Sequence, residues 1–232
     1  MLVLDAGNVL FGQAASNKSQ GAIQIRAMNL MGYDAMAVGE GDLAATAEVL
    51  RERLGEADFA VLSANLGPAD QLPLAPYVLK TLDGHTAAII GATAPNAATR
   101  TQPGIKLTVE PPLQAISRTV AGLRGQADVI VILSNLTVKE NEELAARVPG
   151  IDVIVGAHDS AARMGSRTVA GPDGSVVIAV TYRQGQYLSV LTVRLDDAGR
   201  VVNFTGQDQV LTDKYANDPA MVELLGEYGI TP

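Results

Sequence analysis

The chain has 232 residues, of which 47% are hydrophobic and 18% charged, and its formal net charge is -8. This length and composition are ordinary for a globular protein with a substantial core. The acidic balance argues against non-specific nucleic-acid binding, which requires a basic face. The absence of cysteine excludes disulfides and thiolate metal sites. No apolar stretch approaches the ~20 residues of a transmembrane helix, and the first residues lack the pattern of a signal peptide.

Short apolar strands alternate with helical segments through the first two thirds of the chain. Strands are predicted at residues 2–4, 34–38 and 59–64, helices at 21–32, 43–54 and 111–123, and loops at 12–20, 65–75 and 93–104. Asp42 is placed to cap the helix that follows it. This alternation is typical of an α/β protein.

The stretch from 127 to 160 has the clearest pattern in the chain. Two continuous apolar runs, Val129–Leu133 and Val153–Val155, flank a helical segment at 138–148. Such runs indicate buried parallel strands joined by a crossover helix. Asn135 follows the first strand and His158 follows the second. Because ligands bind at the carboxyl ends of strands in open α/β sheets, we expect these two side chains to lie side by side.

The last third of the chain consists mostly of hairpins. Turn residues separate paired strand-like segments at 77–82 and 86–90, at 168–170 and 176–181, and at 187–194 and 201–204, before a final helix at 219–228. No internal repeat or linker interrupts the chain. We therefore expect one domain over residues 1–232, an α/β fold in which two mixed β-sheets pack together with helices outside.

Polar groups follow four of the predicted strands. They are Asn8, the pair Glu40 and Asp42, Asn135, and His158 with Asp159 and Ser160. Oxygen and imidazole groups at successive strand ends indicate a cation site. Each group also has a structural interpretation, as a turn former, a helix cap or a hydrogen-bonded histidine. The other histidine, His85, lies in a predicted hairpin and is expected on the surface.

Several motifs, in order along nearly the whole chain, resemble those of the 5'-nucleotidases, within the calcineurin-like metallophosphoesterases. Leu4–Asn8 is similar to their LDAGD motif, and residues 29–39 are similar to the segment that leads into GNHE. Ser63–Asn65 matches SAN, Ser134–Leu136 corresponds to SHLG, and residues 149–158 correspond to PGIDVIIGGH. The resemblance implies a four-layer α/β/β/α sandwich.

This chain departs from the catalytic pattern of that family. The resemblance implies two metal ions held by an upstream Asp-x-His, a bridging Asp and later Asn and His residues. This chain has Asn8 for the bridging Asp, Glu40 and Gly41 for the Asn and His of GNHE, Asn135 for the His of SHLG, and Ser160 for the last His. Only His158 is retained.

These replacements make a two-metal centre improbable, because two divalent cations ~3.5–4 Å apart need a shared anionic ligand and Asn8 is neutral. We expect no cofactor beyond at most one divalent cation (Mn, Zn, Mg or Ca). Its ligands would be Asn8, Glu40, Asn135 and His158, with Asp42, Asp159 and Ser160 lining the pocket.

Two functions follow from this pattern. The first is a degenerate phosphoesterase domain, catalytically impaired, that acts as a binding or structural module. The second is an active metal-dependent phosphoester hydrolase with a rebuilt site that uses Glu40, Asp42, His158 and Asp159. Whether the chain is an enzyme stays open at this point, and a phosphorylated small molecule is the candidate ligand of either.

The resemblance also implies features at the two ends. The family's first strand would precede Met1, and its C-terminal nucleotide-specificity domain would follow Pro232. Without that first strand, residues 2–4 would form an open apolar edge, so we expect self-association through it. The family is largely exported, which implies a bacterial periplasmic or secreted protein. No nucleic-acid partner and no membrane segment are expected.

Overall fold

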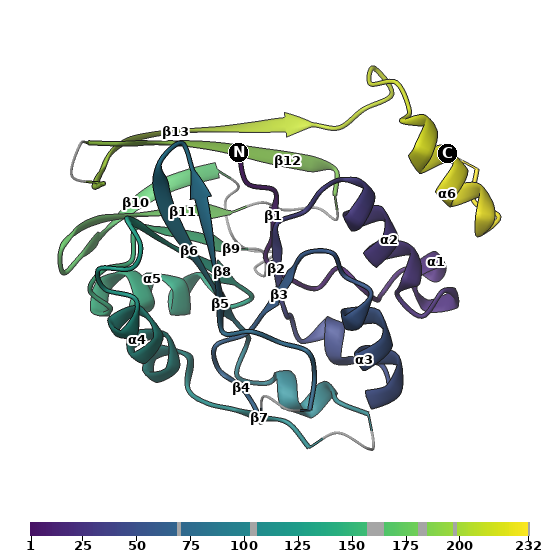
Figure 1. Cartoon of the computed structure of the whole chain (residues 1–232), viewed down its shortest axis with the longest axis horizontal. Helices are drawn as coiled ribbons and strands as arrows, with labels where there is room; N and C mark the ends of the chain where they lie inside the picture. Colours follow the sequence, from purple (N-terminus) through teal and green to yellow (C-terminus); the bar gives the residue numbers. More distant parts are fainter. Residues whose placement is uncertain (69–70, 103–105, 157–164, 181–184, 197–198, 232) are drawn as a thin grey trace.

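Two β-layers face each other, and helices cover the outer face of the six-stranded sheet and of the three-stranded part of the opposite layer (Figure 1). The computed structural model describes residues 1–68, 71–102, 106–156, 165–180, 185–196 and 199–231. This arrangement confirms the predicted α/β fold of two packed sheets flanked by helices. No helix in these ranges is long and apolar enough to cross a membrane.

The larger layer is a six-stranded mixed sheet in the order β10-β11-β9-β8-β6-β5. Its strands are β5 (Tyr77–Leu82), β6 (His85–Ala92), β8 (Val129–Ser134), β9 (Val153–Gly156), β10 (Gly165–Gly171) and β11 (Gly174–Val180). Strands β6, β8, β9 and β11 are parallel, and the two outermost strands are antiparallel to their neighbours. Helix α5 (Val138–Arg147) connects β8 to β9, as the apolar runs predicted.

The second layer consists of two separate pieces. One is a parallel three-stranded sheet of β1 (Leu4–Asp5), β2 (Ala35–Ala37) and β3 (Ala60–Leu62). The other is an antiparallel ribbon of β12 (Tyr187–Leu195) and β13 (Val201–Val210). A small pair, β4 (Leu66–Gly67) with β7 (Thr108–Val109), lies apart from both. A buried apolar cluster between the layers includes Leu62, Ile89 and Leu133.

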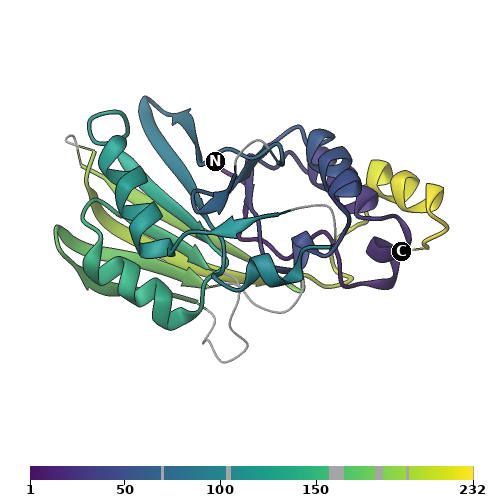
Figure 2. The same ribbon diagram turned by 90° about the horizontal axis from the view of Figure 1, so that it is seen from below.

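The helices form the outer layers (Figure 2). Helix α4 (Pro112–Gly122) and α5 pack on the six-stranded sheet around Ile116, Ile132 and Leu144. Helices α2 (Ala22–Leu30) and α3 (Ala47–Gly55) cover the second layer around Ile25, Met36 and Leu50, with α1 (Ala14–Lys18) beside α2. Helix α6 (Pro219–Glu227) lies against α2, where Arg26 forms an ion pair with Glu227.

The structure differs from the predicted elements in several places. The predicted loop at 65–75 contains β4, and the predicted loop at 93–104 contains a 3₁₀ turn, Ala97–Arg100. Residues 12–20, predicted as a loop, contain the short helix α1. The helix predicted to begin at residue 43 begins at Ala47, because Thr46 caps it by accepting the Val49 N–H. Asp42 therefore is not the helix cap and lies in a separate 3₁₀ turn, Gly41–Leu43.

Candidate functional site

Three of the predicted rim residues meet where the two layers join. Asn8 follows β1, Glu40 follows β2 and Asn135 follows β8. The Glu40 N–H donates to Asn135 Oδ1 at 3.1 Å, which connects the second layer to the six-stranded sheet. The Gly41 N–H donates to Asn8 Oδ1 at 2.7 Å, which connects the loops after β1 and β2. His158, Asp159 and Ser160 lie outside the described residues.

Asp42 connects the loops after β1 and β2 through buried hydrogen bonds. Its side chain is buried, and its two carboxylate oxygens accept the N–H groups of Asn8, Leu10 and Gly39, each at 2.8 Å. Burial raises the pKa of Asp42, and these hydrogen bonds oppose that increase. Such a fully coordinated carboxylate holds the rim together, and its oxygens are turned toward the backbone.

The backbone leaves little room around Asn8. This residue has a φ of 66°, in the left-handed region that Asn tolerates better than most residues. A Cβ built on Gly39 would lie 2.3 Å from Asn8 Oδ1, and one on Gly41 would lie 3.0 Å from the same atom. The loop after β2 therefore requires glycine at position 39 as long as Asn8 keeps this orientation.

The Glu40 side chain contacts a loop in which the sequence analysis identified no site residue. Its Oε2 accepts a hydrogen bond from Asn96 Nδ2 at 2.5 Å, and its Oε1 lies 3.8 Å from an Arg100 nitrogen. The Glu40 side chain is 13% exposed, so this charge is largely withdrawn from solvent. The sequence held one signal of this contact, because Arg100 is the one charged residue of the predicted loop at 93–104.

Asn135 presents a donor at the rim. The residue is fully buried, and its Oδ1 must face the Glu40 N–H because that donor needs an acceptor. Among the residues that the structure describes, the other half of the amide, Nδ2, is buried without a hydrogen-bond partner. An N–H₂ group repels a cation, so Asn135 cannot replace a metal-ligating histidine in this orientation.

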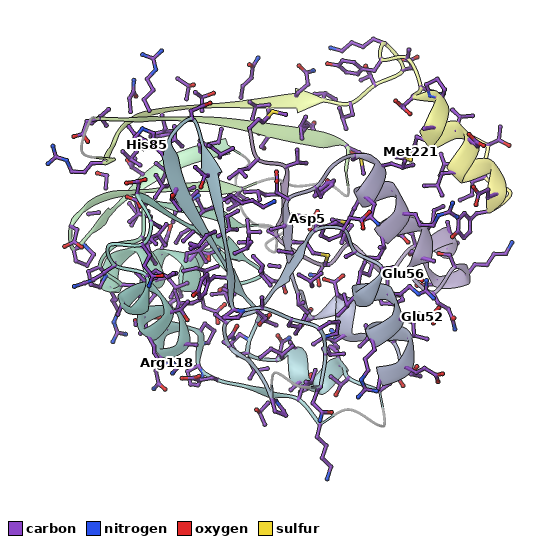
Figure 3. All side chains as sticks on the ribbon, in the orientation of Figure 1. Asp5, Glu52, Glu56, His85, Arg118 and Met221 are labelled. Atoms are coloured by element: carbon purple, nitrogen blue, oxygen red, sulfur yellow. The ribbon has the colours of Figure 1, made fainter. Side chains whose placement is uncertain are left out.

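Asp5 is a second rim carboxyl that sequence reasoning missed. Its Oδ1 accepts the Gly7 N–H at 2.7 Å, and Figure 3 shows it near the centre of the view, whereas His85 lies toward the edge. Burial, with a smaller contribution from the charge of Asp42, raises the pKa of Asp5 from 3.8 to about 6. The proximity of the two carboxyl groups depends on tertiary structure, which explains why the sequence did not reveal it.

The donor set does not fit a pair of metal ions. Each of Asn8, Glu40, Asp42 and Asn135 has an oxygen that already accepts a hydrogen bond from an N–H of this protein. Within the residues that the structure describes, no group of three or more His, Asp or Glu side chains is arranged to hold a metal ion. A cation at this rim would have to share these oxygens with the N–H donors.

Comparison with known sequences identifies the relatives of this chain. It is 29% identical to human 5'-nucleotidase over 95% of its own length and 42% of that protein. It is 26% identical to the trifunctional nucleotide phosphoesterase YfkN of Bacillus subtilis, over 86% of this chain and 16% of that protein. The chain thus spans less than half the length of these relatives. No family model matches it.

Comparison with solved structures agrees. A 5'-nucleotidase precursor from Thermus thermophilus superposes with a TM-score of 0.89 at 28% identity, over 98% of this chain and 49% of that one. The calcineurin-like phosphoesterase YfkN of Bacillus subtilis shares the fold, with a TM-score of 0.80 at 19% identity over 98% of this chain and 82% of that one. The chain therefore belongs to the calcineurin-like metallophosphoesterase superfamily, as a domain of the 5'-nucleotidase N-terminal type.

Proposed function

We propose that this domain has lost two-metal hydrolysis and acts as a binding or structural module on a phosphoesterase fold. One observation supports this proposal most directly. At Asn8, Glu40, Asp42 and Asn135, side-chain oxygens accept N–H groups from the protein itself. These internal hydrogen bonds stabilise the rim and use acceptor capacity that a metal would otherwise take.

The chemistry of two-metal hydrolysis supports the same conclusion. Two divalent cations require a shared anionic ligand to offset their repulsion, and the neutral Asn8 cannot supply it. Gly41 has no side chain that could transfer a proton to a leaving group. What remains at the rim can position a ligand and donate hydrogen bonds, and its carboxylates Glu40 and Asp42 already accept hydrogen bonds from the protein.

We propose a phosphorylated small molecule as the ligand. Two donors support this assignment: the buried Nδ2 of Asn135 and the guanidinium of Arg100, whose side chain is 59% exposed. Guanidinium and amide N–H groups are common partners of phosphate oxygens. We also propose that the natural protein is exported, since its relatives include snake venom proteins and a protein described as a precursor.

Metal binding provides the first test. The purified chain is dialysed against Mn²⁺, Zn²⁺, Mg²⁺ or Ca²⁺ in turn, and bound metal is measured. We expect at most one equivalent, and Glu40→Gln should remove it, whereas Glu48→Gln, on the exposed face of α3, should leave it unchanged. Two equivalents of tightly bound metal would overturn the proposal.

Turnover provides the second test. We expect no hydrolysis of nucleoside monophosphates or of an aryl phosphate at about 1 per second or faster with any of these metals. Asn8→Asp alone should not restore it, because Gly41 still lacks a side chain. Turnover at enzymatic rates that Glu40→Gln abolishes would instead establish the alternative, an active hydrolase with a rebuilt site.

A further inference from the structure

Helix α4 and the first residues of β5 leave a hollow between them. Its volume is about 320 Å³, which lies at the lower end of the range for small-molecule sites. The Arg118 side chain, which Figure 3 shows on α4 toward the edge of the view, is 63% exposed and marks the solvent side of this hollow. None of the described residues that line it belongs to the rim, so the hollow is separate from the candidate site.

The floor of the hollow is apolar. Leu123 is 1% exposed and belongs to the core beneath α4, and both Ala64 and Tyr77 pack against that core while remaining partly buried. Pro76 also lines the hollow. Gly122, the last residue of α4, contributes no side chain, and a Cβ built there would meet no atom within 4 Å. A ligand with an apolar body therefore has both room and matching surface here.

Two polar side chains border this floor. Arg118 Nη1 and Nη2 donate to the Glu110 carboxylate at 2.6 and 2.7 Å, and the other N–H groups of the guanidinium can donate to a ligand. The Thr119 hydroxyl donates to the Ala115 carbonyl at 2.9 Å, so its oxygen still has lone pairs that accept a hydrogen bond. The hollow thus offers one donor group and one acceptor beside an apolar surface.

The charges at the hollow cancel. Among the described residues that line it, Arg118 alone is charged, and Glu110 neutralises it. The hydrogen bond between them lowers the pKa of Glu110 and raises the pKa of Arg118, so both stay ionised at neutral pH. An anion would be repelled by Glu110 and by the net charge of -8, and a cation would find this carboxylate already paired. The electrostatics therefore favour a neutral ligand.

We propose that this hollow binds a neutral, planar aromatic molecule that carries a carboxamide. The ring would lie over Leu123 and against the Tyr77 ring, where aromatic contact adds to the burial of apolar area. The amide oxygen would accept from the Arg118 guanidinium, and the amide N–H would donate to the Thr119 hydroxyl oxygen. This site does not depend on whether the rim hydrolyses phosphoesters.

The test uses the 232-residue chain labelled with ¹⁵N and the probe benzamide. We expect the amide signals of Tyr77, Thr119, Gly122 and Leu123 to shift in a saturable manner, with a Kd of about 1–10 mM for a molecule of one ring. Benzoate and benzylammonium have the same ring with a negative or a positive charge. Each should bind more weakly than benzamide by about threefold or more.

Two glycine variants test whether the hollow is the site. Gly122 and Gly55 each end a helix, and a Cβ at either position meets no atom within 4 Å, so the fold should tolerate leucine at both. Gly122→Leu should weaken benzamide binding by about tenfold or more, because its side chain takes the space of the ring. Gly55→Leu, on α3, should bind benzamide as the parent does. Thermal unfolding checks that both variants fold.

A third variant tests the assigned hydrogen bond. Thr119→Val keeps the shape of the side chain and removes the acceptor oxygen. It should weaken benzamide by about threefold and leave acetophenone unchanged, because acetophenone has the same ring and carbonyl but no N–H. A structural role of Thr119 would change the binding of both probes equally. This comparison remains decisive if Gly122→Leu does not fold.

Three results would overturn the proposal. The first is the absence of saturable shifts at these amides at about ten times the expected Kd. The second is a folded Gly122→Leu variant that binds benzamide as tightly as Gly55→Leu. The third is tighter binding of benzoate or benzylammonium than of benzamide, since the ligand would then be charged.

Discussion

The two β-layers of this protein are built from similar apolar strands but differ in how completely they are paired. In the six-stranded sheet, β6, β8, β9 and β11 each have a strand on both sides, and Ile132 at its centre is fully buried. In the opposite layer, β1 and β12 each have one partner in the described chain, and Leu191 is partly exposed. Strands β2 and β3 of the second layer are buried as well, and this layer also has side chains that connect its loops.

The same difference between the layers affects the residues of the candidate site. Asn135 lies at the end of the well-paired β8, so its position is set by the sheet. Asn8 and Glu40 follow the short strands β1 and β2, and Asp42 holds both of their loops in place. The geometry of the rim therefore depends on one buried carboxylate more than on the strands that lead to it.

Apolar truncations should show the largest contrast between the layers. Ile132→Ala should lower the free energy of unfolding by about 3–4 kcal/mol, because it leaves a cavity in a fully buried site. Leu191→Ala should lower it by about 1 kcal/mol, because this side chain is already partly exposed. Urea unfolding measures both values. Equal losses would show that the two layers are packed equally well.

Aspartate truncations should give the next largest contrast. Asp42→Ala should lower the free energy of unfolding by about 2–3 kcal/mol, because it leaves the N–H groups of Leu10 and Gly39 buried without acceptors. Asp152→Ala, in the six-stranded layer, removes one hydrogen bond to the Ile130 N–H and should cost about 1 kcal/mol. Thermal unfolding compares the two, and a milder effect at position 42 would contradict the role given to Asp42.

Replacement of Asp5 should give the smallest change in the free energy of unfolding, and it should raise this free energy. The pKa of Asp5 is raised to about 6, so the folded protein holds this proton more tightly than the unfolded chain. Protonated Asp5 therefore contributes favourably to the stability of the folded protein below pH ~4, and this contribution is lost as the pH rises through about 6. A shift of about two units corresponds to at most about 3 kcal/mol, which partial exposure reduces to about 1–2 kcal/mol.

Asp5→Asn keeps an acceptor for the Gly7 N–H and removes the charge. We expect this variant to be about 1–2 kcal/mol more stable than the parent at pH 7 and nearly equal to it at pH 4. Urea unfolding of both proteins at the two pH values measures the difference. A variant that is less stable at pH 7 would show that the ionised carboxylate is favourable.

Strand pairing within the larger layer was predictable because its strands carry their own signal. The apolar run Val129–Leu133 and the helix after it are sufficient to predict a parallel β-α-β unit. The meeting of Asn8, Glu40 and Asn135 also followed from the rule that parallel strands end at one rim. These features depend on local pattern and on general topology.

The remaining features depend on contacts between distant residues. Asp42 looks like a helix cap in the sequence, but it accepts backbone N–H groups from the loop after β1, some 30 residues earlier. The partnership of Glu40 with Asn96 and Arg100 likewise crosses more than 50 residues. Neither contact has a spacing or composition that a single sequence would show.

The close approach of Gly41 to Asn8 has a consequence for how this protein can change over generations. A Cβ at position 41 would lie 3.0 Å from Asn8 Oδ1, which is tighter than an ordinary van der Waals contact. A residue other than glycine at position 41 therefore requires the Asn8 side chain to shift by a few tenths of an ångström. Substitutions at the two positions are thus coupled, because the side chain that 41 tolerates depends on how far the side chain at 8 can move.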